Sequence, residues 1–567
     1  MFFVNLQSFK KTIILRMKKY LISLSFSFLS LLVCAQGFSS LQQRKLTNAL
    51  TAISNLYVDS IDDKKMVETA IEAMLKELDP HSSYIPKTEV ERVNEPLEGS
   101  FEGVGIQFQL LEDTLLVVQT ISGCPAEKVG VLPGDRIIYI NDELIAGTIA
   151  GVKPQSSDIM KRLRGKKGTE VIVKILRAGK KELLTFKIIR DKIPIYSVDA
   201  SYMIGKDIGY IKINNFGATT VEEFQKSFTA LQKLGMKHLI LSLQGNGGGY
   251  LTAAHGLADE FLSNDKLIVY TQGLNQPKSV MEATAKGRFE TGKLIVLVDE
   301  YSASASEILS GAVQDWDRAI IVGRRTFGKG LVQRQLPLVD GSMLRLTTAR
   351  YYTPTGRCIQ KSYKDGVDNY EKDLLNRYKH GEFLHADSIH FPDSLRYQTL
   401  RLKRTVYGGG GIMPDIFVPI DTARFTDYHR EIVARGILNK VTAQYIDKNR
   451  AELKKKYTSF EKFKKNFEVD DVLLEQLKAA ADKEKIEVKV TVKSLSDSTE
   501  TVVNKELDIK KQFELSKPLI KLQIKALVAR DLWEMSQYYQ IMDAENESLQ
   551  KAVEILRTPG AYEKILK

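Results

Sequence analysis

The sequence predicts an α/β protein of several domains, with helical regions at both ends and a β-rich module ahead of the α/β part. Its 567 residues correspond to roughly three or four domains at about 100 to 200 residues each. From residue 207 onward, short apolar strands alternate with amphipathic helices, which is the pattern of an α/β protein. From about residue 425, segments rich in Lys, Glu and Leu indicate helices. A single small module is therefore excluded.

Cysteine and histidine are scarce in this chain. Three cysteines without a CxxC pair exclude both a disulfide framework and a zinc ribbon. The seven histidines form no HExxH motif, so metal-dependent hydrolysis of that common kind is not expected. The formal charge of +12 first suggests a nucleic-acid partner.

Residues 1–35 are predicted to be a signal peptide for export. Five basic residues precede the apolar run at residues 21–33, and the small residue Ala35 follows it. A run of about 13 residues fits a secretory signal, whereas a membrane-spanning helix needs about 20. Met17 opens a compact signal by itself, so the start is either Met1 or Met17.

Removal of the signal lowers the net positive charge that suggested a nucleic-acid partner. Without its five basic residues the chain keeps 77 basic and 70 acidic residues, a formal charge of +7. No basic stripe studded with aromatic residues follows, so we predict no nucleic-acid partner. Two routes to membrane association stay open. One is an uncleaved signal, and the other is lipidation of Cys34, which the bulky Val33 disfavours.

Residues 36–97 carry apolar side chains at helical spacing. This pattern predicts two core-facing helices, one with Leu46 and Ile53 and a second that ends before Pro80. His81 follows within the run LDPHSSY. Because no serine and aspartate nearby complete a triad, we interpret His81 as a turn or capping residue without a catalytic role.

Residues 98–190 are predicted to form the β-rich module. Glycines before an exposed strand leave backbone N–H groups free for a terminal carboxylate, and the strand edge can pair with an extended peptide. The order of GVGI, SGCPAEKVG, PGDRIIYIND and LRGKKGT resembles a PDZ domain. The resemblance implies that the helix from Ser157 to Arg164 flanks a groove for a polypeptide C-terminus. The implied carboxylate-binding loop consists of Gly103, Val104, Gly105 and Ile106.

The α/β part is predicted to span residues 191–424. Within it, the strand from His238 to Leu243 leads into a glycine-rich loop at residues 245–249, which precedes a helix. Such a loop presents several N–H groups to one anion, either a phosphate or an oxyanion. A phosphate is disfavoured because neither the P-loop ending Gly-Lys-Ser/Thr nor GxGxxG is present.

Three serines, Ser302, Ser304 and Ser306, stand at the predicted start of an apolar helix. Serines in this position are most often N-caps, and the sequence alone does not choose among them. A helix N-terminus also stabilises an oxyanion. Lys329 follows within TFGKGLVQ, where Phe327, two glycines and apolar neighbours would desolvate it and lower its pKa towards that of a general base.

These motifs, with TPTGR at residues 353–357, make the sequence resemble the carboxyl-terminal processing proteases, or tail-specific proteases, over about residues 40–420. The resemblance implies a crotonase/ClpP-like α/β protease core with an inserted PDZ domain, and a Ser-Lys dyad that needs no metal or cofactor. It makes Ser304 the nucleophile, Lys329 its general base and Gln333 an assisting residue. The implied oxyanion hole uses backbone amides of Gly247, Gly248 and Ala305.

The same resemblance places an acidic residue, Glu307, close to the site and gives Arg164 a role in coupling the PDZ domain to it. An arginine beside two lysines is, however, more often simply solvated. The chain also departs from the family, which usually reads LDLRGNGGG where this sequence reads LSLQGNGGG. Ser242 and Gln244 thus replace an acid and an arginine, and we expect neutral hydrogen bonds from both as the substitute.

The end of the chain carries no recognisable chemistry. Four glycines at residues 408–411 lead into an apolar strand that we predict to complete the protease core. Residues 425–567 are predicted to form a mainly helical extension, interrupted by a strand-like stretch from Val488 to Val492. This extension would support the protease or build a homo-oligomer interface.

The expected function is that of an exported serine endopeptidase, periplasmic or membrane-associated, which recognises polypeptide substrates by their C-termini and cleaves them through an acyl-enzyme. Two alternatives stay open. A peptide-binding adaptor with weak or lost activity is motivated by Ser242 and Gln244. An enzyme for a phosphate ligand is motivated by the glycine loop.

Overall fold

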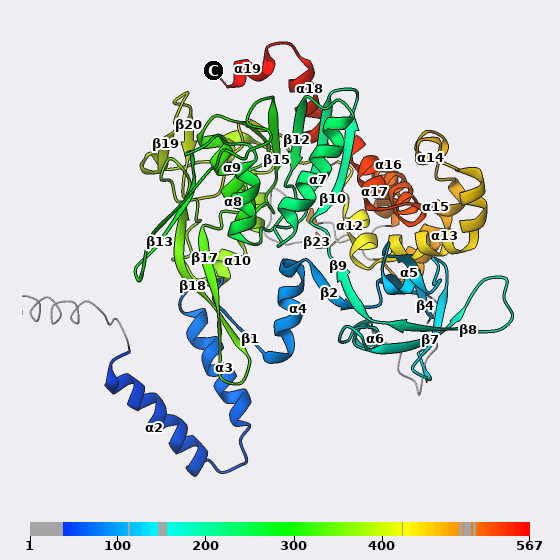
Figure 1. Ribbon diagram of the computed structural model, residues 1–567, viewed down its shortest axis with the longest axis horizontal. Helices are drawn as coiled ribbons and strands as arrows, with labels where there is room; N and C mark the ends of the chain where they lie inside the picture. Colours follow the sequence, from blue (N-terminus) through cyan, green and yellow to red (C-terminus); the bar gives the residue numbers. More distant parts are fainter. Residues whose placement is uncertain are drawn as a thin grey trace, which may run out of the picture. The chain divides into compact units, whose positions relative to one another are not determined.

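The computed structural model describes residues 38–111, 114–145, 156–421, 423–486, 491–492, 501–502 and 506–566 (Figure 1). The predicted signal at residues 1–35, with Cys34, lies outside the described residues. The chain divides into two compact units, Met1–Met74 and Leu75–Lys567. No helix in the described ranges is long and apolar enough to cross a bilayer.

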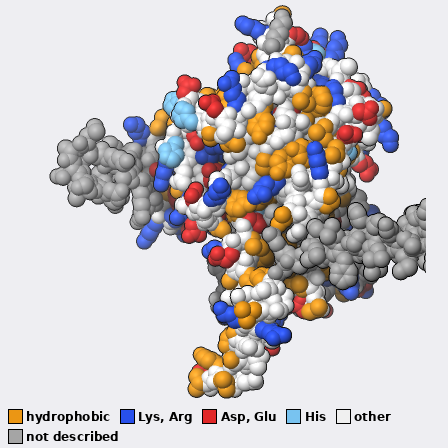
Figure 2. Space-filling model, turned by 90° about the vertical axis from the view of Figure 1, so that its left-hand side faces the viewer, with side chains coloured by type: hydrophobic (Ala, Val, Ile, Leu, Met, Phe, Trp, Pro, Cys, Tyr) orange, Lys and Arg blue, Asp and Glu red, His pale blue; other side chains and the backbone are white. Residues whose placement is uncertain are grey.

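The first unit contains α2 (Ser40–Leu56) and most of α3 (Asp63–Lys76). Ser39 caps α2 by accepting a hydrogen bond from the backbone of Gln42. α2 buries none of its residues, and hydrophobic side chains are visible at the surface of these helices at the bottom of Figure 2. The prediction that this helix faces a core is therefore wrong within the described part of the chain. Helical periodicity reports an apolar face but not what covers it.

The β-rich module forms one antiparallel sheet of order β3–β4–β5–β7–β8, with β6 beside β5. Alternate residues point into its core, as in β7, where Val171, Val173 and Ile175 are buried. A separate pair, β2 (Ser100–Gly103) and β9 (Asp191–Pro194), joins the two ends of the module. The other elements are β3 (Ile106–Leu111), β4 (Thr114–Thr120), α5 (Pro125–Lys128), β5 (Arg136–Ile140), β6 (Glu143–Leu144), α6 (Ser156–Leu163), β7 (Glu170–Leu176) and β8 (Leu184–Ile189).

The α/β core is built on a six-stranded sheet of order β10–β11–β12–β15–β16–β21. β10 is antiparallel to β11, and the other neighbours are parallel. β11, β15 and β16 are buried along their whole length, as expected for parallel strands covered on both faces. The strands are β10 (Val198–Ile204), β11 (Ile208–Ile213), β12 (His238–Ser242), β15 (Leu294–Val298), β16 (Ile320–Gly323) and β21 (Ile416–Phe417).

Helices cover both faces of this sheet (Figure 1). α7 (Thr220–Lys233), α8 (Leu251–Asp259) and α9 (Ala305–Asp315) pack against one face. α18 (Glu547–Arg557) and α19 (Ala561–Ile565) pack against the other. The sequence placed α18 and α19 in an extension beyond the protease core, but they form one of its layers. A sheet that is apolar on both sides needs cover on both.

A second sheet carries the strand that follows Lys329. β17 (Leu331–Pro337) pairs with β18 (Met343–Tyr352), which also pairs with β1 (Ser83–Ile85) and β13 (Leu267–Gly273). Because β1 precedes the β-rich module and β18 follows most of the core, this sheet brings distant parts of the chain together. The remaining elements of this region are α4 (Lys87–Glu98), β14 (Gln276–Glu282), α10 (Val367–Glu371), α11 (Asp373–Lys379), β19 (Arg396–Gln398) and β20 (Thr405–Tyr407).

The C-terminal helices before α18 share an apolar core of their own. The strand-like stretch predicted there appears as β22 (Thr491–Val492), paired with β23 (Thr501–Val502), and residues 488–490 lie outside the described residues. The helices are α12 (Asp427–Ala434), α13 (Ile437–Lys456), α14 (Phe460–Asn466), α15 (Asp471–Lys483), α16 (Glu506–Leu532) and α17 (Met535–Met542), followed by the short turn η3 (Asp543–Glu545).

Candidate active site

The glycine loop follows β12 and lies against the start of α9. Gly248 has a φ of 102°, and a Cβ at this position would lie 2.8 Å from Ser304 Cβ, so a side chain would push the loop away from Ser304. Asn246 is fully buried, and its Oδ1 accepts from Gly248 N–H at 2.8 Å. The Asn246 carbonyl accepts from Ala303 N–H at 3.0 Å and from Ser306 Oγ at 2.9 Å. The loop and the serine segment are therefore one hydrogen-bonded unit.

The structure distinguishes the three serines that the sequence left equivalent. Ser302 and Ser306 are fully buried, and both hydroxyls donate to backbone carbonyls, that of Ser302 to Leu243 at 2.8 Å. Ser304 is partly exposed at the N-cap of α9, with φ 54° and ψ −110°. Such a conformation costs a residue other than glycine about 1–3 kcal/mol. Strain at an accessible hydroxyl beside the glycine loop makes Ser304 the candidate nucleophile.

Lys329 lies in the loop between β16 and β17. Burial lowers the pKa of its ammonium below the usual range, and the positive charge of Arg345 lowers it further, whereas Glu307 and Asp79 oppose the shift. The direction agrees with the sequence argument that its neighbours desolvate this lysine. Among the described residues, no hydrogen bond joins Lys329 Nζ to Ser304 Oγ, and the bonds made by Lys329 involve its backbone.

Glu307, fully buried in the first turn of α9, connects the two candidate residues. Its Oε2 accepts from the backbone N–H of Ser304 at 2.8 Å and from that of Lys329 at 2.9 Å. Its Oε1 accepts from Gly328 N–H at 2.7 Å and from Thr326 Oγ1 at 2.5 Å. Burial raises the pKa of Glu307 to about 7, against the four hydrogen bonds, which favour the carboxylate. One side chain thus fixes the spacing between the two backbones.

Tyr351 of β18 provides a second connection. Its hydroxyl donates towards the carbonyl oxygens of Lys329 at 2.8 Å and Ser304 at 3.1 Å. The side chain is almost wholly buried, and burial raises the pKa of its phenol well above the usual value. Sequence reasoning missed Tyr351 because it is one aromatic residue in an ordinary strand. Only the pairing of that strand with β17 brings it to the site.

Gln333 of β17 makes no hydrogen bond with the Lys329 side chain among the described residues. Its Nε2 donates to Thr347 Oγ1 at 3.2 Å on the paired strand. Thr347 Oγ1 in turn donates to Asp79 Oδ1 at 3.0 Å. The register of β17 and β18 sets Gln333 opposite Thr347, so its amide binds across the sheet and not along the strand to Lys329.

The residues expected to form the oxyanion hole lie together but differ in availability. The position of a Cβ on Gly248 is 3.0 Å from Ala305 N, so the loop meets the N-terminus of α9. Gly248 N–H, which the resemblance also assigns to the oxyanion hole, donates to Asn246 Oδ1 in this structure. The N–H groups of Gly247 and Ala305 have no acceptor among the described residues. These two amides are available to an oxyanion.

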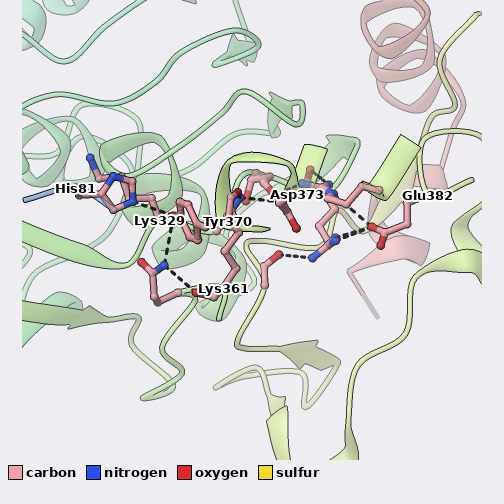
Figure 3. Close-up of polar contacts among 12 residues, drawn as sticks. His81, Lys329, Lys361, Tyr370, Asp373 and Glu382 are labelled. Carbon is pink, nitrogen blue, oxygen red and sulfur yellow. Dashed lines mark hydrogen bonds and ion pairs between the residues drawn. The ribbon is translucent and has the colours of Figure 1, made fainter. Parts of the chain in front are cut away.

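The segment around His81, expected to form only a turn, also borders the site. The turn is present, since His81 N–H donates to Asp79 Oδ1 at 2.8 Å. His81 Nε2 lies 2.8 Å from the Tyr370 hydroxyl, and Figure 3 shows His81 beside Lys329. Burial lowers the pKa of His81 to about 4, assisted by the positive charge of Lys329. The motif LDPHSSY was the available signal, and its place at the site was missed.

The helices α10 and α11 support the Lys329 loop from the side of Tyr370 (Figure 3). The Lys361 ammonium lies 3.8 Å from the ring centre of Phe327 and 4.2 Å from that of Tyr370, and it pairs with Asp373 at 2.8 Å. Arg377 donates to the carbonyls of the two residues before Phe327 at 2.7 and 3.1 Å. The loop that carries Lys329 is therefore held by charged side chains on one side and by Glu307 on the other.

A groove of about 410 Å³ lies between β3 and α6 in the β-rich module. Val104, Gly105 and Ile106 line it, but Gly103 does not, because Gly103 pairs with Asp191 in the sheet of β2 and β9. A Cβ on Gly105 would lie 2.4 Å from Cys124 Cβ, so only glycine fits this turn. The other lining residues are largely apolar: Phe101, Gln107, Phe108, Met160, Leu163 and Arg164.

Arg164 is bound and not simply solvated. Its guanidinium lies 4.5 Å from the ring centre of Phe101 and pairs with Glu95 of α4 at 2.6 Å. The adjacent Asn94 accepts from Gln335 of β17 at 2.8 Å. A line of direct contacts therefore runs from the groove through α4 to the strand that follows Lys329.

The residues that depart from the family pattern behave differently from each other. The Ser242 hydroxyl is buried and meets no strict hydrogen-bond geometry among the described residues, but it lies close enough to the Tyr210 phenol to oppose the rise in that group's pKa that burial causes. Gln244 Oε1 accepts from Asn546 Nδ2 at 2.8 Å. The well-formed neutral hydrogen bond is therefore that of Gln244, and its partner lies more than 300 residues further along the chain. Among the residues that the structure describes, no group of His, Cys, Asp or Glu side chains is arranged to hold a metal ion.

A strained serine at a helix N-terminus, a desolvated lysine and a largely apolar groove beside a strand indicate a protein of the serine-peptidase class. Residues 207–369 match peptidase family S41, and residues 103–188 match the PDZ domain. Residues 34–89 match the activating protease CtpB N-terminal domain, and residues 428–534 match a family of unknown function.

The chain is 37% identical over 320 residues to the carboxy-terminal processing protease CtpB of Bacillus subtilis, covering 56% of this chain and 65% of the relative. It is 37% identical over 344 residues to the carboxy-terminal-processing protease of Bartonella bacilliformis, covering 58% and 77%. A solved structure of the photosystem II D1 C-terminal processing protease is 27% identical, with a TM-score of 0.32, covering 55% of this chain and 89% of that chain. The chain belongs to peptidase family S41, the carboxy-terminal processing serine proteases.

Proposed function

We propose that this chain is an exported serine endopeptidase that binds polypeptide C-termini in its PDZ groove and cleaves through an acyl-enzyme on Ser304. The observation that carries the proposal is the shared carboxylate of Glu307, which fixes the backbones of Ser304 and Lys329 beside the glycine loop. Export to the periplasm or the outer side of a membrane rests on the sequence pattern of residues 1–35. The crotonase/ClpP-like description of the core is part of the same proposal.

In the proposed acylation, neutral Lys329 takes the proton of Ser304 Oγ while that oxygen bonds to the scissile carbonyl carbon. The carbonyl electron pair moves onto oxygen, where the N–H groups of Gly247 and Ala305 and the positive end of α9 stabilise it. Collapse of this intermediate breaks the C–N bond, and the Lys329 ammonium gives its proton to the leaving amine. The hydrogen bond between Lys329 Nζ and Ser304 Oγ must form first, because it is not among those made by the described residues.

Deacylation follows the same route with water as the nucleophile. Lys329 takes a proton from the water, whose oxygen attacks the ester carbon of the acyl-enzyme. When the new intermediate collapses, the Ser304 oxygen leaves and recovers its proton from Lys329, so the enzyme returns to its starting state. The depressed pKa of Lys329 supports this role, because a lysine at its ordinary pKa stays protonated at neutral pH.

The PDZ groove supports the proposed substrate class. Its largely apolar lining fits an apolar C-terminal side chain, and backbone N–H groups at its glycine turn suit a terminal carboxylate. The contacts from Arg164 through Glu95 and Asn94 to Gln335 offer a route by which an occupied groove affects β17. Tail binding would then both hold the substrate and influence the Lys329 loop.

The proposal is tested by cleavage of an unfolded protein that ends in either an apolar or a charged tail. Wild type should cleave the apolar-tailed substrate faster, and Ser304→Ala and Lys329→Ala should each abolish cleavage while keeping the wild-type circular dichroism spectrum. Undiminished cleavage by both variants would exclude the proposed dyad. An equal rate on both tails would exclude tail recognition.

A second candidate is a PDZ adaptor with little turnover. It is favoured by the absent contact between Lys329 Nζ and Ser304 Oγ and by the engagement of Gly248 N–H with Asn246. This candidate predicts tail binding without covalent chemistry. Detection of an acyl-enzyme on Ser304 by mass spectrometry would rule it out.

A further inference from the structure

We infer that the C-terminal region is a working part of the active site, in which Asn546 positions the glycine loop through the side chain of Gln244. The inference rests on the proposed function, since it takes the glycine loop to be the oxyanion-binding loop. Asn546 lies between η3 and α18, in a part of the chain whose sequence carries no recognisable chemical motif.

Gln244, the residue just before the glycine loop, is held at two points. Its side-chain Oε1 accepts from Asn546 Nδ2 at 2.8 Å, and its backbone carbonyl accepts from Lys212 Nζ at 2.8 Å. The next residue, Gly245, donates its N–H to Asp299 Oδ1 at 3.0 Å. The start of the loop is therefore placed by side chains from β11, from the end of β15 and from the C-terminal region.

The C-terminal region also controls the Lys212 side chain. The Lys212 ammonium lies 5.1 Å from the ring centre of Tyr539 in α17. Burial lowers the pKa of Lys212, and the nearby carboxylates of Asp543, Asp199 and Asp299 oppose that shift. Asp543 is fixed in turn by the Tyr202 hydroxyl, which donates to its Oδ2 at 2.7 Å. Residues 539–546 thus hold Gln244 directly through Asn546, and Tyr539 and Asp543 also lie next to Lys212, which makes the second attachment.

The position of Asn546 is fixed by its place at the N-terminus of α18. Its Oδ1 accepts from Leu549 N–H at 3.2 Å and so caps α18. α18 is anchored because Leu549, Ala552 and Ile555 are buried against the central sheet. The two ends of one amide therefore have separate tasks: the oxygen caps the helix, and the nitrogen donates to Gln244 at 2.8 Å and, more weakly, to Asp543 Oδ1 at 3.4 Å.

Hydrogen bonds, more than packing, fix the position of the Gln244 side chain. A cavity of about 480 Å³ borders Gln244, Gly245 and Asn546, so the side chain is not tightly packed on that side. A shift of Gln244 would reach the serine segment through Asn246, whose carbonyl binds Ala303 N–H and Ser306 Oγ. The expected consequence is a misplaced amide at the oxyanion, which affects the transition state more than the bound substrate.

The separate tasks of the amide allow a specific test with Asn546→Ser. Serine keeps an oxygen that caps α18 but is too short, and lacks the amide, to hold Gln244. The partner variant is Gln244→Ala, with the double variant to complete the cycle. Asp470→Ala serves as the matched control, because Asp470 caps α15 in the same C-terminal region, away from the loop.

We expect Asn546→Ser and Gln244→Ala each to lower kcat by about 3- to 10-fold with KM nearly unchanged, as for loss of one buried hydrogen bond expressed in the transition state. The double variant should be no slower than the slower single variant. Labelling of Ser304 by a fluorophosphonate probe should slow in parallel, because its phosphoryl oxygen uses the same amides. Asp470→Ala should lower thermal stability and leave both rates unchanged.

The outcomes separate the two proposals. An active wild type with unchanged kcat and labelling rate in Asn546→Ser would overturn the inference and leave the proposed function standing. Additive losses in the double variant, or equal losses in Asp470→Ala, would show a general effect of stability and also overturn it. A wild type that neither cleaves nor labels would overturn the proposed function, and the inference with it.

Discussion

Lys329 donates its backbone N–H to Glu307 Oε2 at 2.9 Å. The same oxygen accepts from Ser304 N–H at 2.8 Å, so the distance between the backbones of the proposed nucleophile and the proposed base is set by a buried carboxylate and not by their own side chains. A hydrogen bond between Lys329 Nζ and Ser304 Oγ would therefore join two backbones that Glu307 already holds in place. Assembly of the dyad is therefore expected to be a local, side-chain event.

The three serines should respond differently to alanine. Ser304→Ala is expected to lower kcat by at least about 1,000-fold with little loss of stability, because the hydroxyl is the reacting group. Ser302→Ala and Ser306→Ala remove buried hydrogen bonds, so each should lower the free energy of unfolding by about 1 kcal/mol and still form an acyl-enzyme. Cleavage rates and urea unfolding measure the two effects. An acyl adduct on Ser302 or Ser306 would contradict the assignment.

Arg345 should tune the pH profile of the enzyme. Its positive charge lowers the pKa of Lys329, so Arg345→Met is expected to shift the ascending limb of kcat/KM against pH to higher pH. Arg334→Met, at an exposed position on β17, is the matched control and should leave the limb in place. Coincident profiles for wild type and Arg345→Met would show that Lys329 is not the titrating base.

Glu307 should make stability depend on pH in a defined direction. Burial raises its pKa from 4.5 to about 7, so its protonated form is favoured by folding. This contribution is fully present below about pH 4.5 and is lost as pH rises through 7, a change of up to about 3 kcal/mol. Glu307→Gln should therefore lose less stability than wild type between pH 5 and 8 in urea unfolding. Glu371 is exposed, so Glu371→Gln is the control and should show the same dependence of the unfolding free energy on pH as wild type. If Glu307→Gln also showed that dependence, Glu307 would not be the group responsible.

Arg164 should determine how much faster a substrate with an apolar C-terminal tail is cleaved than the same substrate without the tail. Arg164→Ala removes the contacts with Phe101 and Glu95, so the ratio of cleavage rates with and without the tail should fall towards one. Arg164→Lys should not restore the ratio, because an ammonium cannot both stack on the ring and bind the carboxylate as a planar guanidinium does. Tail-peptide binding by fluorescence anisotropy separates affinity from coupling. A ratio unchanged in Arg164→Ala would argue against the contacts through α4.

Much of the fold could be predicted from local pattern. The strands of the α/β core, the glycine loop and the β-rich module each carry a short-range signal in periodicity or turn residues. The helix α2 shows the limit of this reasoning, because Leu46 and Ile53 have core-like spacing but are exposed in the structure. The assignment of α18 to an extension failed for the opposite reason, since an amphipathic helix does not encode which surface it will cover.

The candidate chemistry could be predicted from local sequence: a serine at a helix start, a lysine among apolar neighbours and a glycine loop, each encoded by residues close together in the chain. Tertiary structure alone decided which serine is accessible and strained. It also decided that Glu307 and Tyr351 bind the backbones of both Ser304 and Lys329, and that Asn546 binds Gln244. These relations join segments that are distant in sequence, and their strength comes from burial, which removes competing water and exists only after the sheets and helices have packed.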